Sequence, residues 1–212
     1  MNSLSLHYNT YLELVLPTWL IAIVSSTYHK SKEEIQAELV QIEKAQRDPR
    51  EFASIYNRYY DEIFIYISRK IGDYDMVGEV TSRTFTKCLM HIDRYKYKGV
   101  PFSAWLYKIA MNEVRQFFRS KKHYPRSVSL SETDIAEITQ ETMEESRYDD
   151  AHILLPKLLG HLKEKELQIV ELRFFEKKSF KEIGFILGLT EVNAKVKLYR
   201  IINKLKKIAL DK

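Results

Sequence analysis

The side chains with the clearest chemical potential are cations near the C-terminus. They alternate with a stripe of apolar residues at helical spacing, which contains Ala194, Leu198, Ile202 and Leu205. The cations occupy the rest of the same expected helix, at Lys195, Lys197, Arg200, Lys204, Lys206 and Lys207. Ammonium and guanidinium groups bind phosphate oxygens and can donate hydrogen bonds to guanine edges. A lysine-rich helix face is also typical of a helix that is merely exposed to water. The residues before this helix must therefore indicate whether its cations bind an anionic partner.

A second, shorter helix is expected immediately before the basic one. Ser179 followed by Glu182 is a capping box, which predicts the start of a helix. Gly188 predicts its end, because glycine adopts a left-handed turn at little cost. Thr190 is a good N-cap for the basic helix. Two short helices around a glycine turn, the second one basic, indicate a helix-turn-helix whose second helix enters a DNA major groove. An ordinary helical hairpin with a solvated face is the alternative.

Composition excludes several other kinds of function. The 212 residues are 45% hydrophobic and 30% charged, as in an ordinary globular chain, and the net charge of +5 permits an anionic partner. The single cysteine, Cys88, suits a reducing cytoplasm and falls within an apolar helical pattern. The six histidines show no metal-ligand spacing, and there is no phosphate loop or nucleophile motif. We therefore expect no catalytic residue, metal or cofactor.

The periodicity predicts an all-α chain of two small helical domains, because no strand pattern occurs. The helices are expected at about 31–47, 52–67, 74–95, 104–122, 153–174, 180–187 and 191–207. A polar, aromatic loop, RYKYKGVPFS, separates the third helix from the fourth. The segment 127–150 is rich in Asp and Glu against one base, Arg147, which is typical of a flexible acidic linker. The domains expected are 1–30, an apolar extension; 31–124, the first helical domain; 125–152, the linker; and 153–212, the helix-turn-helix domain.

Residues 1–30 leave three interpretations open. The segment is strongly apolar, but Glu13 and Pro17 interrupt it, so the uninterrupted apolar run is shorter than the ~20 residues that span a bilayer. No basic region precedes it, as a signal peptide requires. A helix packed on the domain is favoured over a segment that contacts a membrane surface or a partner. An upstream extension that is not normally translated is the third interpretation.

Beyond these patterns, two segments resemble a known family. FSAWLYKIAMN at 102–112 closely matches a signature of the bacterial RNA polymerase sigma factors of the extracytoplasmic-function (ECF) type, and EVTSRTF at 79–85 resembles a second. The segment 171–207 follows the same family's helix-turn-helix pattern almost position by position. This sequence departs from the family pattern at several positions, which include Arg83, Gln116, Gly184, Val192 and Asn193. These departures leave the promoter sequence open but do not change the class of protein that the resemblance implies. The N-terminal extension lies outside the family pattern.

The resemblance implies a function, partners and three sets of site residues. It implies a transcription initiation factor, not an enzyme, that binds RNA polymerase core and promoter DNA, with an anti-sigma protein as a further candidate partner. Residues implied to read the upstream, minus-thirty-five element are Asn193, Lys195, Val196, Lys197, Tyr199, Arg200 and Lys204. Residues implied to handle the melted minus-ten element are Tyr95, Tyr97, Lys98, Asn112, Arg115, Arg119 and Lys122. Residues implied to dock the polymerase are Asp75, Glu79, Thr84 and Phe85.

Several of these residues have a structural alternative. Glu79 and Thr84 are expected to be exposed, whereas Phe85 could equally belong to the core. Trp105 lies in the Ala-Trp-Leu signature, so core packing is favoured over a melting role. Tyr199 shares a helix face with Lys195 and could instead pack on its own helix. The linker could mimic nucleic acid or serve as an inert tether.

Two other functions must be distinguished from the one that the family resemblance implies. A stand-alone helix-turn-helix regulator would explain 179–207 but not FSAWLYKIAMN at 102–112. A nuclease with a DNA-binding tail would need clustered carboxylates for a metal, and the acidic cluster here falls in the expected linker. Residues that meet DNA and polymerase place the protein in the cytoplasm.

Overall fold

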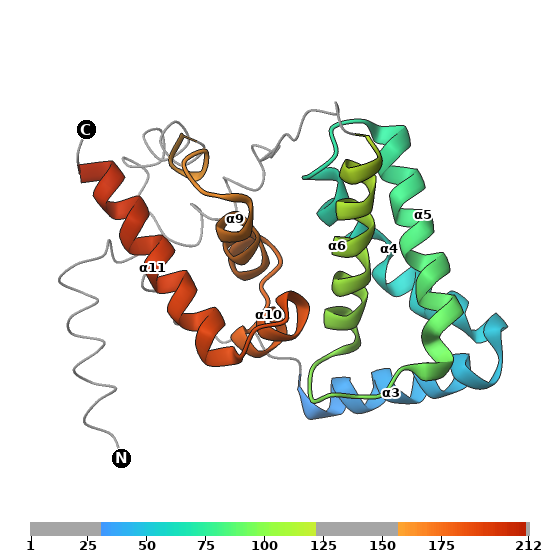
Figure 1. The fold of residues 1–212 in the computed structure, drawn as a ribbon. Helices are drawn as coiled ribbons and strands as arrows, with labels where there is room; N and C mark the ends of the chain where they lie inside the picture. The colour runs from blue at the N-terminus through green and yellow to red at the C-terminus, as the bar shows by residue number, and fades with distance from the viewer. Residues whose placement is uncertain (1–30, 122–156, 211–212) are drawn as a thin grey trace, which may run out of the picture. The chain divides into compact units, whose positions relative to one another are not determined.

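The computed structural model describes residues 31–121 and 157–210 (Figure 1). Within these ranges every regular element is helical, so the predicted all-α class is confirmed. The helices are α3 (Lys32–Arg47), η1 (Pro49–Glu51), α4 (Phe52–Ser68), α5 (Tyr74–His91), η2 (Ile92–Arg94), α6 (Phe102–Ser120), α9 (Glu164–Val170), η4 (Glu171–Phe175), α10 (Phe180–Leu187) and α11 (Glu191–Leu210). None of them combines the length and apolarity needed to cross a membrane. The expected extension at 1–30 and the linker at 125–152 lie outside the described residues.

The described residues divide into two compact units. One contains 31–121 together with 180–194, and the other contains 157–179 together with 195–210. The predicted domain boundaries at 124 and 153 fall outside the described ranges and stay predictions. Each unit is described separately below.

Local capping sets where the helices of the first unit begin. Ser31 forms a capping box with Glu34, whose carboxylate accepts from the Ser31 amide at 2.7 Å. Asp48 caps the short η1 turn. The Asp73 carboxylate accepts from two amides of the first turn of α5, at 3.0 and 3.2 Å. These bonds satisfy amides that have no partner inside a helix.

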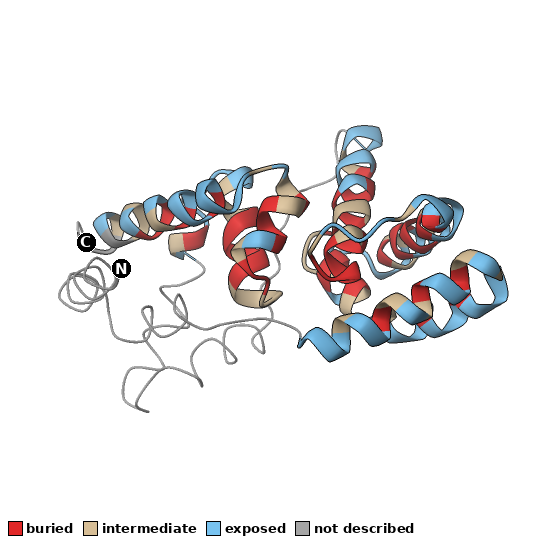
Figure 2. Ribbon diagram, turned by 90° about the horizontal axis from the view of Figure 1, so that it is seen from below, coloured by how far each residue is buried: buried red, intermediate tan, exposed pale blue. Residues whose placement is uncertain are grey.

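The core of the first unit lies between α4, α5 and α6. Figure 2 shows their buried residues turned toward one another. Ile63 and Ile67 of α4, Val80 of α5, and Leu106 and Tyr107 of α6 are fully enclosed. Burying a side chain of this size stabilises the fold by about 1.5–3 kcal/mol. The helix α3 is mostly exposed and runs across the end of this bundle (Figures 1 and 2).

The structure departs from the expected helix boundaries in several places. The helix predicted over 74–95 ends at His91 and continues as the tighter turn η2. The helix predicted over 153–174 is interrupted at 160–163, and α9 begins at Glu164. After Val170 it widens into a π-helical segment, in which the Glu176 amide donates to the Glu171 carbonyl. Lys177 then has a φ of 49°, in the left-handed region. Hydrophobic spacing does not distinguish these turns from an ordinary helix.

The turn between α10 and α11 follows the sequence prediction. Gly188 has a φ of 70°, in the left-handed region that glycine tolerates, and α10 ends at Leu187. The Thr190 hydroxyl accepts from the Asn193 amide at 3.1 Å, which confirms the predicted N-cap of α11. A Cβ on Gly184 would lie 2.8 Å from the Leu189 carbonyl oxygen. The chain therefore returns close over α10 at this glycine.

Candidate nucleic-acid interface

An aromatic loop joins η2 to α6 and carries part of the predicted minus-ten set. Tyr95 is half-buried, and its ring lies 5.1 Å from the rings of both Phe102 and Trp105. The next aromatic residue, Tyr97, is 44% exposed, and Lys96 and Lys98 on either side of it are exposed as well. Exposed aromatic faces stack on unpaired bases, and neighbouring cations pair with the backbone. The loop therefore offers both kinds of contact.

Trp105 belongs to this aromatic cluster rather than standing free. Its ring lies 5.3 Å from Phe102, in addition to its contact with Tyr95, and the residue is half-buried. The favoured packing role of Trp105 is consistent with this geometry.

The helix α6 presents the rest of the predicted minus-ten residues. Asn112, Arg115 and Arg119 are all exposed, and their spacing of three and four residues places them on one helix face. Lys122 lies outside the described residues. The opposite face of α6 is buried, including Ala110 and Val114.

The predicted polymerase-binding set divides into two pairs. Asp75 and Glu79 are exposed on α5. Thr84 is 0% exposed and donates its hydroxyl to the Val80 carbonyl at 2.8 Å, so the expectation that it is exposed is wrong. Phe85 is also buried, at 3% exposed, and packs 4.8 Å from the Tyr56 ring. The core alternative for Phe85 therefore describes its position, because its ring packs against α4, whereas Asp75 and Glu79 are exposed.

A buried carboxylate that sequence reasoning missed joins α5 to α6. The Glu113 side chain is 2% exposed and pairs with Arg83 at 3.0 Å and with Lys87 at 2.5 Å. Arg83 also lies 3.6 Å from Glu79 on its own helix. Lys87 reaches Gln116 of α6 at 3.4 Å. Glu113 is the immediate neighbour of Asn112, so this ion pair fixes the helix face that carries the predicted DNA contacts. The two cations Arg83 and Lys87, four residues apart on one helix face, were the available signal for a carboxylate partner.

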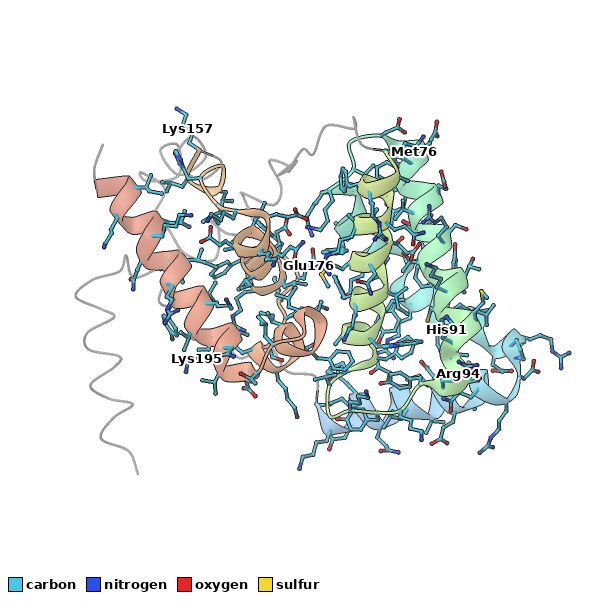
Figure 3. All side chains as sticks on the ribbon, in the orientation of Figure 1. Met76, His91, Arg94, Lys157, Glu176 and Lys195 are labelled. Atoms are coloured by element: carbon cyan, nitrogen blue, oxygen red, sulfur yellow. The ribbon has the colours of Figure 1, made fainter. Side chains whose placement is uncertain are left out.

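The helix α11 exposes most of the predicted upstream set. Its exposed members are Asn193, Lys195, Val196, Lys197 and Arg200, and Tyr199 is half-exposed. Lys195 lies near the start of α11 (Figure 3). Ala194, Leu198 and Ile202 are buried as predicted, and Ile201 joins them. Leu205, expected in this stripe, is only half-buried.

Lys204 differs from the other predicted DNA contacts. Its ammonium lies 2.8 Å from the Glu166 carboxylate and 3.1 Å from the His161 carbonyl oxygen. The hydrogen bond from Lys204 lowers the pKa of the Glu166 carboxyl below its usual value. The structure therefore brings Lys204 to α9, where it ties the later part of α11 to the same unit.

Burial raises the pKa of two further groups. Desolvation raises the pKa of the Cys88 thiol well above its usual range, so the buried thiol stays protonated. Desolvation also raises the pKa of the Tyr95 hydroxyl, and the nearby Glu38 carboxylate and Tyr97 add to the effect. Tyr95 thus remains a neutral stacking surface at physiological pH.

The fold and these surfaces define an all-helical, two-part DNA-binding protein with a helix-turn-helix. Comparisons with known proteins then give the family. Residues 55–124 match the family described as Sigma-70 region 2, and residues 158–207 match Sigma-70, region 4. This chain belongs to the sigma factors of RNA polymerase, and within them to the ECF type.

Individual relatives agree with this assignment. The chain is 28% identical over 172 residues to the ECF RNA polymerase sigma factor BldN of Streptomyces coelicolor, covering 80% of this chain and 65% of that protein. It is 26% identical over 158 residues to the RNA polymerase sigma factor SigZ of Bacillus subtilis, covering 73% and 84%. The chain thus spans just under two thirds of the length of the first of these relatives.

A solved structure supports the fold. CnrH, determined in complex with the cytosolic domain of CnrY, superposes with a TM-score of 0.57 at 19% identity. The match covers 83% of this chain and 99% of CnrH. The likeness concerns the helical fold.

Proposed function

We propose that this sigma factor binds RNA polymerase core and directs it to specific promoters through two DNA-reading surfaces. The observation that carries the proposal is the pairing of two sigma-family regions, in the expected order, with exposed DNA-binding side chains on each. The protein acts as a transcription initiation factor without catalysing a reaction itself. Its partners place it in the cytoplasm.

The upstream element is the proposed target of α11. The exposed Lys195 and Arg200 lie on a helix whose buried stripe keeps the opposite face in the protein. Arginine and lysine in a major groove bond guanine edges or phosphates. Val196, at 39% exposed, offers an apolar contact of the kind that meets a thymine methyl group.

The minus-ten element is the proposed target of the loop at 95–101 and the exposed face of α6. Tyr97 supplies a stacking surface, and Lys96 and Lys98 supply cations beside it. Arg115 and Arg119 extend the cationic path along α6. Stacking contributes about 1–3 kcal/mol per base in such sites, without requiring a particular base. Base identity must therefore come from the shape in which the loop is held.

The polymerase-docking surface is proposed to lie on the exposed face of α5. Asp75 and Glu79 remain as its candidate contacts. Thr84 and Phe85 are buried on α5 and therefore are not candidate contacts with polymerase. A regulatory anti-sigma partner, implied by the family resemblance, stays a prediction.

Run-off transcription with purified core polymerase on a genomic promoter pool tests the proposal. We expect defined transcripts only when core and this chain are both present. Tight, specific promoter binding by the free chain, with no transcript from the combined proteins, would instead indicate a stand-alone regulator.

A further inference from the structure

The loop that carries Tyr95 and Tyr97 is held at its first residue by α3. The Gln46 side-chain amide donates two hydrogen bonds, to the Ile92 carbonyl at 2.8 Å and to the Tyr95 carbonyl at 3.0 Å. These carbonyls stand at the start of η2 and at the residue that follows it, and the Ile92 carbonyl also accepts from the Tyr95 amide at 3.0 Å. An amide nitrogen has two donors, so one side chain satisfies both oxygens. Gln46 thereby fixes the point at which the loop leaves the helix.

The far end of the same loop is held by a second residue of α3. Glu38 is only 3% exposed, and its carboxylate accepts from the Phe102 amide at 2.9 Å and from the Tyr59 hydroxyl. Phe102 begins α6, and the preceding Pro101 gives no side-chain cap. Glu38 therefore caps α6 from another helix, in a position where a carboxylate also favours the positive end of the helix dipole.

These two anchors bracket the exposed part of the loop. Between them lie Lys96, Tyr97 and Lys98, all exposed to solvent. Fixing a backbone residue costs about 1–2 kcal/mol in conformational entropy. A loop that is already held at both ends loses less conformational entropy when it binds a ligand. Such preorganisation strengthens binding.

We propose that Glu38 and Gln46 are positioning residues that hold the 95–101 loop in the shape that selects bases of the melted promoter strand. Both lie on α3, outside the region 55–124 that matches Sigma-70 region 2. The inference rests on the proposed function, because it names what sets the specificity of one of its DNA surfaces. Neither residue needs to touch DNA.

The sharpest variant is Gln46→Glu, which keeps the size of the side chain but turns a carboxylate toward two carbonyl oxygens. Glu38→Gln is the second variant, since it retains an acceptor for Phe102 but loses the charge. Gln36→Glu is the matched control, because Gln36 is exposed on the same helix. Gln46→Met removes the donors without adding charge, and it replaces Gln46→Glu if the latter has lower helical content.

The first measurement uses the complete chain bound to core polymerase and a bubble template. The unpaired non-template strand carries a short randomised segment, from which bound sequences are recovered. We expect the wild type and Gln36→Glu to enrich one defined sequence. Gln46→Glu should lower that enrichment about tenfold, with unchanged affinity for core, and Glu38→Gln should lower it less.

The second measurement is a spectroscopic signature of the loop. The chain has two tryptophans, so Trp19→Phe leaves Trp105 as the only indole, 5.1 Å from the Tyr95 ring. Releasing the loop exposes Trp105, and its emission should shift to the red in Gln46→Glu but not in Gln36→Glu.

Unchanged enrichment by the Gln46 variants would overturn the inference. So would a loss of enrichment that parallels loss of core binding, because that pattern indicates general destabilisation. Failure of the proposed function gives a different result, in which wild-type protein with core enriches no sequence at all.

Discussion

At the scale of single residues, the exposed cations of α11 are not equivalent. Lys195 and Arg200 are exposed, whereas Lys204 bonds to Glu166 and to a backbone carbonyl. An ammonium group that already donates to these two acceptors has fewer donors left for a DNA phosphate. The residue type alone therefore does not identify the DNA contacts.

Removing an exposed cation of α11 should weaken binding to promoter DNA. Lys195→Ala and Arg200→Ala are each expected to cost about 1–3 kcal/mol if a bidentate base contact is lost. If the lost contact is to a phosphate, all sequences should weaken alike and the salt slope should fall by about one unit. DNA titrations of the complex with core at several salt concentrations separate the two cases. Wild-type transcription by the single and double variants would contradict the placement of α11 in a groove.

Lys204 should instead affect stability, and in a pH-dependent way. The pKa of Glu166 is lowered by Lys204, so the folded state favours the ionised carboxyl. This contribution is fully present above the unfolded value of 4.5 and is lost as the pH falls through the lower folded pKa. Urea unfolding of the wild type and Glu166→Gln between about pH 7 and about pH 3 tests this. We expect the variant to show a weaker loss of stability in acid, and equal slopes would refute the assignment.

At the scale of elements, the contact between α5 and α6 includes one buried charge in addition to its apolar residues. Glu113 is enclosed, while Arg83 and Lys87 reach it from partly exposed positions. Breaking a buried pair leaves an uncompensated charge, which is costly, whereas replacing the whole group with apolar residues is often neutral.

This asymmetry gives a stability prediction. Arg83→Met with Lys87→Met should lower the free energy of unfolding by about 3 kcal/mol, because Glu113 loses both partners. Adding Glu113→Leu should recover most of the loss. Denaturant unfolding of the three proteins provides the comparison. A further loss in the triple variant would show that packing at Glu113, rather than its charge, holds the two helices.

The exposed face of α5 gives a binding prediction. Glu79→Lys should abolish core binding and promoter-dependent transcription with unchanged helical content, because Glu79 is exposed. Thr84→Arg should instead unfold the helix pair, since Thr84 is fully buried. Glu43→Lys, an exposed charge reversal on α3, is the control. Core pull-down and circular dichroism distinguish these results, and normal core binding by Glu79→Lys would exclude this face as the docking surface.

At the scale of the whole molecule, two modest DNA-reading surfaces must act together. Each surface by itself presents only a few exposed contacts on a small helical unit. When a third body holds both at the right spacing, the second contact becomes effectively intramolecular and gains affinity. Polymerase core is the proposed third body.

The free chain should therefore bind promoter DNA weakly, and core should convert weak binding into tight binding. Titration of a promoter fragment at fixed salt, with and without core, measures the difference. Glu79→Lys should remove the gain without changing the weak binding of the free chain. Tight, specific binding by the free protein, insensitive to that change, would contradict a sigma mechanism.

Features that depend on neighbours along the chain could be predicted from the amino-acid sequence. The capping box at Ser31, the left-handed turn at Gly188 and the N-cap at Thr190 were all predictable, because their partners lie within a few residues. The helix class and the buried stripe of α11 followed from periodicity for the same reason. The family motifs were equally readable, since they are contiguous.

Which helix faces meet, and which side chains they enclose, became visible only in the folded chain. Thr84 is a polar residue at a fully buried position, and Glu113 and Glu38 are carboxylates buried among partners far away in the chain. Helical spacing says that such residues share a face, but it does not say which neighbour covers that face. A charge can be buried when a distant partner compensates its desolvation, and that partner is visible only once the helices are packed.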